Sequence, residues 1–313
     1  MGAHEKPKDK NVIGVKWAYR TKLNADETFS SVARLDAIRL LLALAAQKGW
    51  IIHHMDVKSA FLNGHLEEEI FVEQPEGFVV HGQEEKVYRL KKTLYGLKQA
   101  PRSWYGRIDA YLISLGFEKS LSKFTLYVKK TDVEIVIVSL YVDDLLMTGS
   151  SKLIEEFKGG MKEAFEMTNL GKMSFFLGIQ VQQDIGEVFV SQEKYAKEIL
   201  RKFKMEECKP IATPMNQKEK FSNEDGAEKP VKDFSLYGYS DSDWAGSNDD
   251  MKSTSGYCFA FGSGVFSWRS KKQDAIAQSV VKAEYVAAVT AANQAIWLRK
   301  LMVDIHMEQK EST

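Results

Sequence analysis

Residues 133–149, VEIVIVSLYVDDLLMTG, consist of two apolar runs that are interrupted by a pair of carboxylates. Apolar runs of this length, rich in β-branched residues, predict two strands. Paired aspartates between such runs are typical of a tight turn. We therefore predict a β-hairpin that carries Asp143 and Asp144 at its tip.

A third carboxylate lies at the end of an earlier predicted strand, residues 51–57, which contains Asp56. If this strand is a neighbour of the hairpin in one sheet, three acids converge at one edge. Such a cluster is costly without a cation, because like charges raise one another's pKa, and Mg²⁺ is a cation that carboxylate oxygens bind well. The alternative is that Asp143 and Asp144 only form a β-turn.

The composition of the whole chain is that of one or two packed globular domains. Its 313 residues are 44% hydrophobic and include 43 Lys+Arg and 43 Asp+Glu, which argues against disorder and fibrous repeats. Cys208 and Cys258 cannot form a disulfide framework or a CxxC zinc site, so we expect a reduced, intracellular chain, cytoplasmic or nuclear. No apolar run approaches the roughly 18 residues that cross a bilayer, so we expect no membrane contact.

Because the net charge is zero, any site for a polyanion must be a local patch. Residues 86–107 form one candidate, with no acid and four interleaved aromatic residues. Basic side chains neutralise phosphates and aromatic faces stack on bases. The alternative is a solvated cationic face whose aromatic side chains turn into the core. The basic residues of this patch are Lys86, Arg89, Lys91, Lys92, Lys98, Arg102 and Arg107.

Helices and strands alternate along the chain. We predict helices at 32–47, capped by Ser30 or Ser31 and stopped by Gly49, and at about 100–115, 153–165, 192–203 and 280–305. We predict strands at 12–22, 51–57, 70–73, 86–90, 124–129, 133–142, 145–148, 173–182, 188–191, 236–244, 255–261 and 265–269. On the last helix, the predicted packing face consists of Val281, Tyr285, Ala288, Ala292 and Ile296.

Four motifs carry a family resemblance: MDVKSAFLNG at 55–64, LYGLKQAPRSW at 94–104, YVDDLL at 141–146 and FFLGI at 175–179. Together they resemble the reverse transcriptase of Ty1/copia retrotransposons. The resemblance implies an α+β fold with a palm-type sheet and helices on one face, in a split βαβ arrangement. It also implies RNA-directed DNA polymerisation with Mg²⁺, or alternatively Mn²⁺, acting on an RNA template, a DNA primer or RNA–DNA hybrid, and deoxynucleotides.

Carried over to these positions, the resemblance assigns roles to individual residues. Asp56, Asp143 and Asp144 are the implied catalytic and metal-binding acids. Phe61 is the implied steric gate against a ribose hydroxyl, although a core phenylalanine is the alternative. Phe61, Gly96 and Gln99 are the residues expected to bind the nucleotide.

A second set of motifs follows: YSDSDWAG at 239–246, STSGY at 253–257, SWRSKKQ at 267–273 and AEYVA at 283–287. These resemble the ribonuclease H domain of the same elements, an α/β unit. Asp241 and Glu284 are the implied catalytic acids, with Asp243 as a rival to Asp241. Alternatively, Asp241 and Asp243 only alternate outward along a strand.

The chain also departs from the family pattern. After Asp26 the basic stretch of the fingers is missing, the joining segment is short, Lys282 stands where the family commonly has Glu, and Thr313 precedes the remaining ribonuclease H acids. We therefore expect a reverse transcriptase with incomplete fingers at 1–205, a shortened linker at 206–232 and a truncated ribonuclease H-like domain at 233–313. Polymerase activity should be weak or lost. The alternative is a non-enzymatic nucleic-acid-binding remnant of a transposable element.

Overall fold

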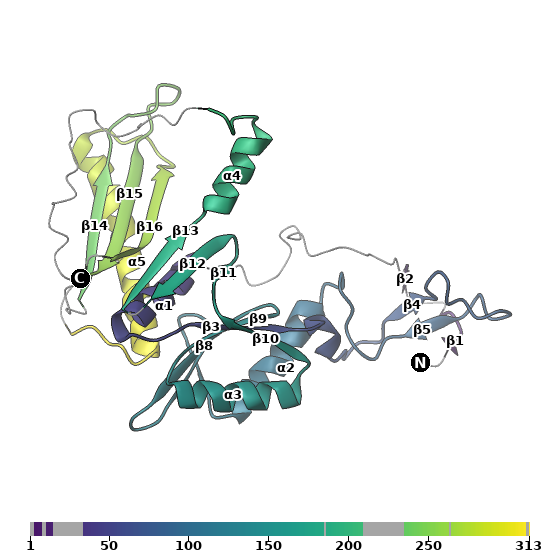
Figure 1. The fold of residues 1–313 in the computed structure, drawn as a ribbon. Coiled ribbons are helices and arrows are strands. Elements are labelled where there is room, and N and C mark those ends of the chain that lie inside the picture. The colour runs from purple at the N-terminus through teal and green to yellow at the C-terminus, as the bar shows by residue number, and fades with distance from the viewer. Residues whose placement is uncertain are drawn as a thin grey trace.

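A six-stranded antiparallel sheet forms the centre of the molecule (Figure 1). The computed structural model describes residues 3–7, 11–14, 34–184, 186–208, 235–262, 264–310 and 313. The strand order of the central sheet is β10-β3-β9-β8-β7-β6. These strands are β3 (His53–Val57), β6 (Glu118–Lys119), β7 (Leu126–Lys130), β8 (Ile135–Tyr141), β9 (Asp144–Gly149) and β10 (Met167–Lys172).

The connections within this sheet follow the predicted split βαβ pattern. Helix α2 (Ala100–Ser114) lies between β3 and the β8–β9 hairpin in the chain, and helix α3 (Ser151–Ala164) connects β9 to β10. The order β10-β3-β9-β8 places the first and last strands of the motif side by side. The prediction of this topology is confirmed, whereas strand β10 was not predicted because its sequence, MTNLGK, lacks an apolar alternation.

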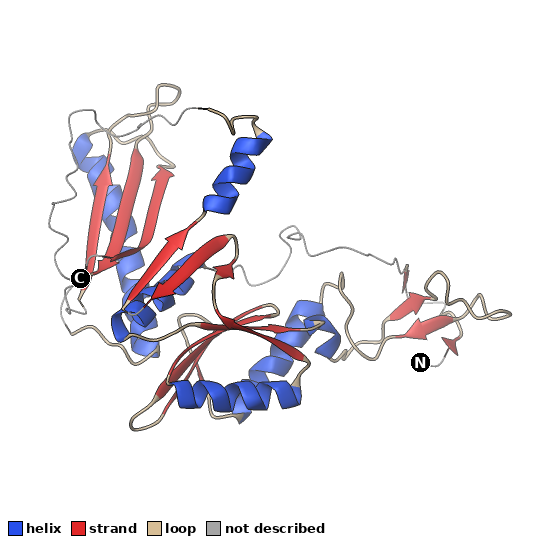
Figure 2. Ribbon diagram, viewed as in Figure 1, coloured by secondary structure: helices blue, strands red, loops and turns tan. Residues whose placement is uncertain are grey.

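Both faces of the central sheet are covered (Figure 2). Helices α2 and α3 pack on one face, where Met55, Val138 and Leu145 point. Helix α1 (Leu35–Lys48) packs on the other face with Leu146, together with a second sheet of β11 (Phe175–Phe176), β12 (Ile179–Asp184) and β13 (Glu187–Ser191). The expectation that helices occupy one face only is therefore wrong for α1. The physical reason is that both faces of these strands are apolar and must be buried.

Helix α1 ends as its sequence predicts, at Gly49, which has a left-handed φ of 65°. Its N-terminal capping position in the structure is Arg34. The proposed caps Ser30 and Ser31 lie outside the described residues, as does the predicted strand 12–22 beyond residue 14.

A separate four-stranded sheet extends to one side of the molecule (Figure 1). Its order is β1-β5-β4-β2, and these strands are β1 (Ala3–His4), β2 (Val12–Ile13), β4 (Phe71–Glu73) and β5 (Val87–Arg89). A short 3-10 helix, η1 (Ala60–Asn63), follows β3 on the way to this sheet. Helix α4 (Glu193–Lys202) follows β13 and has no buried residue.

Residues 235–310, which we call the C-terminal unit, contain an antiparallel sheet of order β14-β15-β16 and one long helix. The elements are β14 (Leu236–Ser242), β15 (Thr254–Phe261), β16 (Gly264–Lys272) and α5 (Val280–Asp304). In the described part of the chain, none of the helices combines the length and apolar content that crossing a membrane requires.

The predicted packing face of α5 is wrong. Val281 and Tyr285 are 78% and 69% exposed, and Ala288, Ala292 and Ile296 are exposed as well. The side chains that α5 buries lie on another side of the helix. They are Ala283, Ala287, Gln294, Leu298, Leu301 and Met302. Because α5 carries apolar residues almost all round, periodicity alone does not select the packed face.

Candidate active site

Two of the predicted acids are direct neighbours across adjacent strands. Asp56 at the end of β3 is the register partner of Asp144 at the start of β9. Directly opposed residues of antiparallel strands have Cα atoms about 5 Å apart and side chains on the same face. The two carboxylates therefore project side by side from one edge of the central sheet.

The third acid, Asp143, lies in the two-residue turn between β8 and β9 and is buried. Val57 N donates to Asp143 O at 2.7 Å, which attaches the turn to the end of β3. Its neighbour Val142 has a φ of 53°, an uncommon conformation for a β-branched residue. Trp104 Nε1 on α2 donates to Val142 O at 2.5 Å and so helps to hold this turn.

His54 is a site residue that the sequence did not single out. Its Nε2 lies 2.8 Å from Asp144 Oδ1. An ionised carboxylate only accepts hydrogen bonds, so His54 Nε2 is the donor. The His54 ring is buried and packs edge-on against Phe176, with 5.6 Å between the ring centres. One carboxylate oxygen of Asp144 is therefore held by the buried ring of His54.

The carboxylates at this end of the strands fit a magnesium site in which the protein supplies only one or two ligands. Among the described residues, no three His, Cys, Asp or Glu side chains gather closely enough to hold a metal by themselves. Mg²⁺, however, is usually held by one or two carboxylates while water and substrate phosphates fill its other positions. The opposed pair Asp56 and Asp144 meets that requirement.

The motif at 94–104 and its flanks hold η1, which carries Phe61. The hydroxyl of Thr93 donates to Phe61 O, and Arg107 Nη1 donates to Asn63 O at 2.7 Å. Gly64 is required here by close approach, since a Cβ at this position would lie 2.8 Å from both Ser103 Oγ and Thr93 Oγ1. The segment that follows Asp56 is thus fixed against the start of α2.

Tyr95 completes the surroundings of Phe61. The two ring centres are 4.7 Å apart. Burial raises the pKa of the Tyr95 phenol, and the negative charge of Asp56 raises it further. Gly96 turns the chain with a φ of 93°, and Gln99 is the residue before α2. In the sequence, Tyr95 is one of the aromatic residues interleaved in the basic patch, and nothing there links it to Phe61.

The basic patch is only partly available to a ligand. Arg89 pairs with Glu69 at 3.1 Å, and Arg107 is bonded to the backbone near η1. Trp104, predicted to stack or to be core, is core at 2% exposure. Lys86 is half-buried. The exposed cations of the patch besides Arg89 are Lys91, Lys92, Lys98 and Arg102.

In the C-terminal unit, Asp241 is exposed on β14 and Glu284 is half-buried on α5. Gln273 connects these elements, because its Nε2 donates to Ser242 Oγ at 3.2 Å and to Ala283 O at 3.0 Å. The segments that carry Asp241 and Glu284 are therefore adjacent. The Asp243 carboxylate accepts from the backbone N–H of Thr254, so that oxygen is already used.

Two adjoining cavities lie over β15, β16 and α5, with volumes of about 140 and 300 Å³. They share Tyr257, Arg269 and Thr290 in their walls. None of the predicted acids lines either cavity.

Residues 23–217 match the family model of the reverse transcriptase (RNA-dependent DNA polymerase). The chain belongs to this reverse transcriptase family. Among its relatives is the retrovirus-related Pol polyprotein from transposon TNT 1-94 of Nicotiana tabacum, which is 32% identical over 98% of this chain. The Pol polyprotein from transposon RE2 of Arabidopsis thaliana is 28% identical over 96% of this chain. The putative transposon Ty5-1 protein of Saccharomyces cerevisiae is 34% identical over 51% of this chain and 53% of its own length.

The resemblance to Ty1/copia reverse transcriptases is confirmed by these relatives. The chain spans 30% of the tobacco polyprotein and 27% of the RE2 polyprotein. The match to the tobacco relative extends over 404 residues, more than the 313 of this chain. That relative therefore contains segments within the matched region that are missing here.

Proposed function

We propose that this chain is an RNA-directed DNA polymerase of a retrotransposon Pol polyprotein whose activity is weak, and that Asp56 and Asp144 hold its Mg²⁺. The observation that carries the proposal is the opposed pair of carboxylates on β3 and β9. Family membership supports the same reaction class. The substrates are then an RNA template, a DNA primer and deoxynucleotides.

In this proposal each residue of the edge has a defined task. Bound Mg²⁺ would supply charge neutralisation for phosphoryl transfer. Asp56 and Asp144 would hold the ion, and the turn that contains Asp143 would keep the end of β3 and the start of β9 together. The Phe61 ring, backed by Tyr95, would exclude a ribose 2′-hydroxyl by steric conflict.

Weak activity is expected because residues that would bind the triphosphate are missing from the sequence. Orientation of the reacting phosphate supplies much of the rate in phosphoryl transfer. The family pattern has a basic stretch after the turn that ends at Asp26. In this sequence that stretch is absent, and Glu27 follows the turn. The exposed cations Lys91, Lys92, Lys98 and Arg102 can still attract a nucleic-acid backbone.

We further propose that residues 233–313 derive from a ribonuclease H domain and retain no cleavage activity. Asp241 and Glu284 supply two carboxylates, whereas two-metal hydrolysis requires a larger cage. The one remaining acid on the same strand segment, Asp243, is engaged with the backbone of Thr254. The likeness of the second motif set to ribonuclease H supports the assignment of origin.

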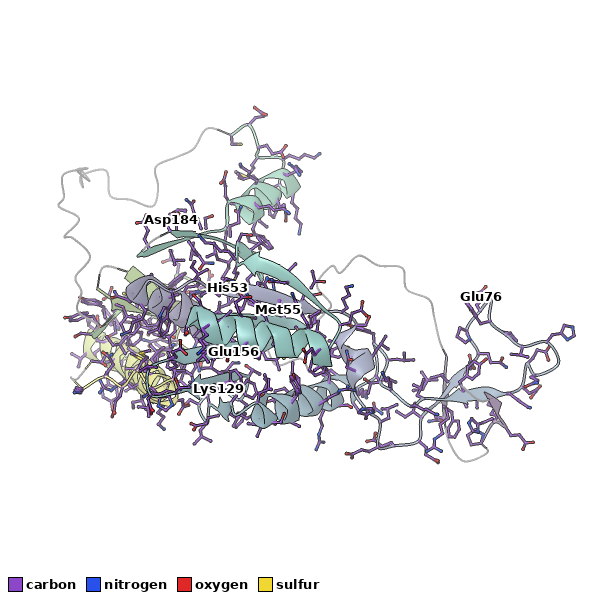
Figure 3. The ribbon with its side chains drawn as sticks, turned by 60° about the horizontal axis from the view of Figure 1, so that its bottom comes forward. His53, Met55, Glu76, Lys129, Glu156 and Asp184 are labelled. Atoms are coloured by element: carbon purple, nitrogen blue, oxygen red, sulfur yellow. The ribbon has the colours of Figure 1, made fainter. Side chains whose placement is uncertain are left out.

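Primer extension on an RNA template with Mg²⁺ tests the polymerase proposal. Wild type should extend the primer by a few nucleotides, and Asp144→Asn should reduce the rate by at least about a hundredfold, because a metal supplies several kcal/mol. Asp184→Asn is the matched control, since Asp184 lies on the separate β12–β13 hairpin (Figure 3). Template binding without extension would favour the non-enzymatic alternative. Long, processive synthesis would contradict the proposed weakness.

A further inference from the structure

Helix α1 buries more of its circumference than a helix on the surface of a domain requires. At about 100° per residue, its buried positions cover an arc of about 200°, whereas a surface helix needs roughly 100°. An arc this wide requires partners on two sides. The buried residues of α1 are Ala37, Ile38, Leu40, Leu41, Leu42, Leu44 and Ala45.

The two sides belong to different parts of the chain. Helix α1 contacts β9 of the central sheet and β16 of the C-terminal unit (Figure 1). Leu146 of the central sheet, Leu41 of α1, and Phe266 and Leu298 of the C-terminal unit belong to one continuous hydrophobic core. No boundary between two cores runs along this surface.

Buried polar groups join the same surfaces. Ser267 Oγ on β16 donates to Asp36 Oδ1 on α1 at 2.8 Å. Gln294 Nε2 on α5 donates to Ser267 Oγ at 3.1 Å, and Arg34 Nη2 donates to Gln294 Oε1 at 2.5 Å. Ser267 and Gln294 are 0% and 5% exposed. Because buried polar groups are costly when unpaired, loss of either side would destabilise the other.

Two further sets of contacts join the C-terminal unit to the rest of the chain. The guanidinium groups of Arg34 and Arg39 lie 3.4 Å and 3.8 Å from the ring centres of Trp297 and Trp268. Asp304 Oδ2 on α5 accepts from Ser120 Oγ at 2.7 Å, close to β6 of the central sheet. The interface between the C-terminal unit and the rest of the chain therefore combines an apolar core with polar contacts.

We propose that the C-terminal unit is a permanently docked structural partner of the polymerase, which completes the core around α1 and unfolds together with it. The unit that docks is this chain's own residues 235–310. The role requires no nuclease chemistry and does not depend on polymerase activity. In the intact protein, α1 and α5 should therefore open in the same unfolding event.

Cleavage of the connection tests the docking directly. A protease recognition sequence is inserted after Ser222 in the full chain, and the purified protein is cut and examined by gel filtration. The two fragments should elute together, at the volume of the uncut chain, in non-denaturing buffer. Fragments that elute separately under these conditions would overturn the proposal.

A matched pair of variants tests the shared unfolding. Ser267→Asp places a second carboxylate against Asp36, whereas Ser270→Asp makes the same change at an exposed position of β16. By hydrogen exchange, Ser267→Asp should lower the protection of both α1 and α5 by at least about tenfold, and Ser270→Asp should not. Loss of protection in α5 with α1 unchanged would contradict the proposal. If Ser267→Asp fails to fold, gel filtration of the cleaved protein, which retains Ser267, decides the question.

Discussion

His54 is the residue whose contact most directly concerns the acids, because it donates to Asp144 Oδ1. Under the proposed function, this bond orients the Asp144 carboxylate toward the metal. Loss of such a supporting bond typically weakens metal affinity by about 10- to 100-fold.

We therefore expect His54→Phe, which retains an aromatic ring against Phe176, to raise the Mg²⁺ concentration for half-maximal primer extension by about tenfold. His54→Gln is the control, because its amide N–H can still donate to Asp144. Equal Mg²⁺ requirements in wild type and both variants would show that the bond does not support the metal site.

Phe61 makes a prediction about nucleotide selection. Its ring lies against the ring of Tyr95. Under the proposed function, removal of the Phe61 ring would relieve the steric conflict with a 2′-hydroxyl. We expect Phe61→Val to reduce the preference for deoxynucleotides over ribonucleotides by roughly tenfold or more, measured as the ratio of kcat/KM values in single-nucleotide addition. An unchanged ratio with a lower melting temperature would instead assign Phe61 to the core.

At the scale of elements, the β8–β9 hairpin depends on Gly149 at its open end. Gly149 has a φ of 129°, and a Cβ there would collide with the backbone carbonyl of Ile135 on β8. We expect Gly149→Ala to lower the free energy of unfolding by at least about 2 kcal/mol, measured by urea denaturation.

The matched control is Gly159→Ala on α3, where nothing lies within 4 Å of the added Cβ. Alanine at a helix interior is favoured over glycine, so this variant should gain about 0.5–1 kcal/mol. Similar changes in stability for both glycines would mean that the hairpin does not impose the strain at Gly149.

At the scale of the whole molecule, the C-terminal unit is expected to pack but not to cleave. Asp241 and Glu284 are the two acids assigned to this unit, and two-metal hydrolysis requires more carboxylate ligands than these two. A labelled RNA–DNA hybrid incubated with the full chain and Mg²⁺ should therefore remain intact. Mg²⁺-dependent cleavage that disappears in Asp241→Asn would contradict this expectation.

The sequence predicted the elements more reliably than their contacts. The hairpin with Asp143 and Asp144 could be predicted because a long apolar run is interrupted by two acids at one point. Strand β10 could not be predicted, since its sequence is mostly polar and it is a strand through pairing with β3. The pairing of Asp56 with Asp144 could not be predicted either, because it depends on the register between two strands, which the pattern of one strand does not specify.

The sequence by itself determined the family, because the motifs that carry the resemblance are contiguous. It also predicted the strands beside Asp56, Asp143 and Asp144, because their apolar pattern is local. Tertiary structure alone decided three other features. It selected the packed face of α5, the bond from His54 to Asp144, and the docking of the C-terminal unit on α1. The physical reason is that apolar residues lie on several sides of α1 and α5, so the buried side is chosen by contacts between segments far apart in the chain.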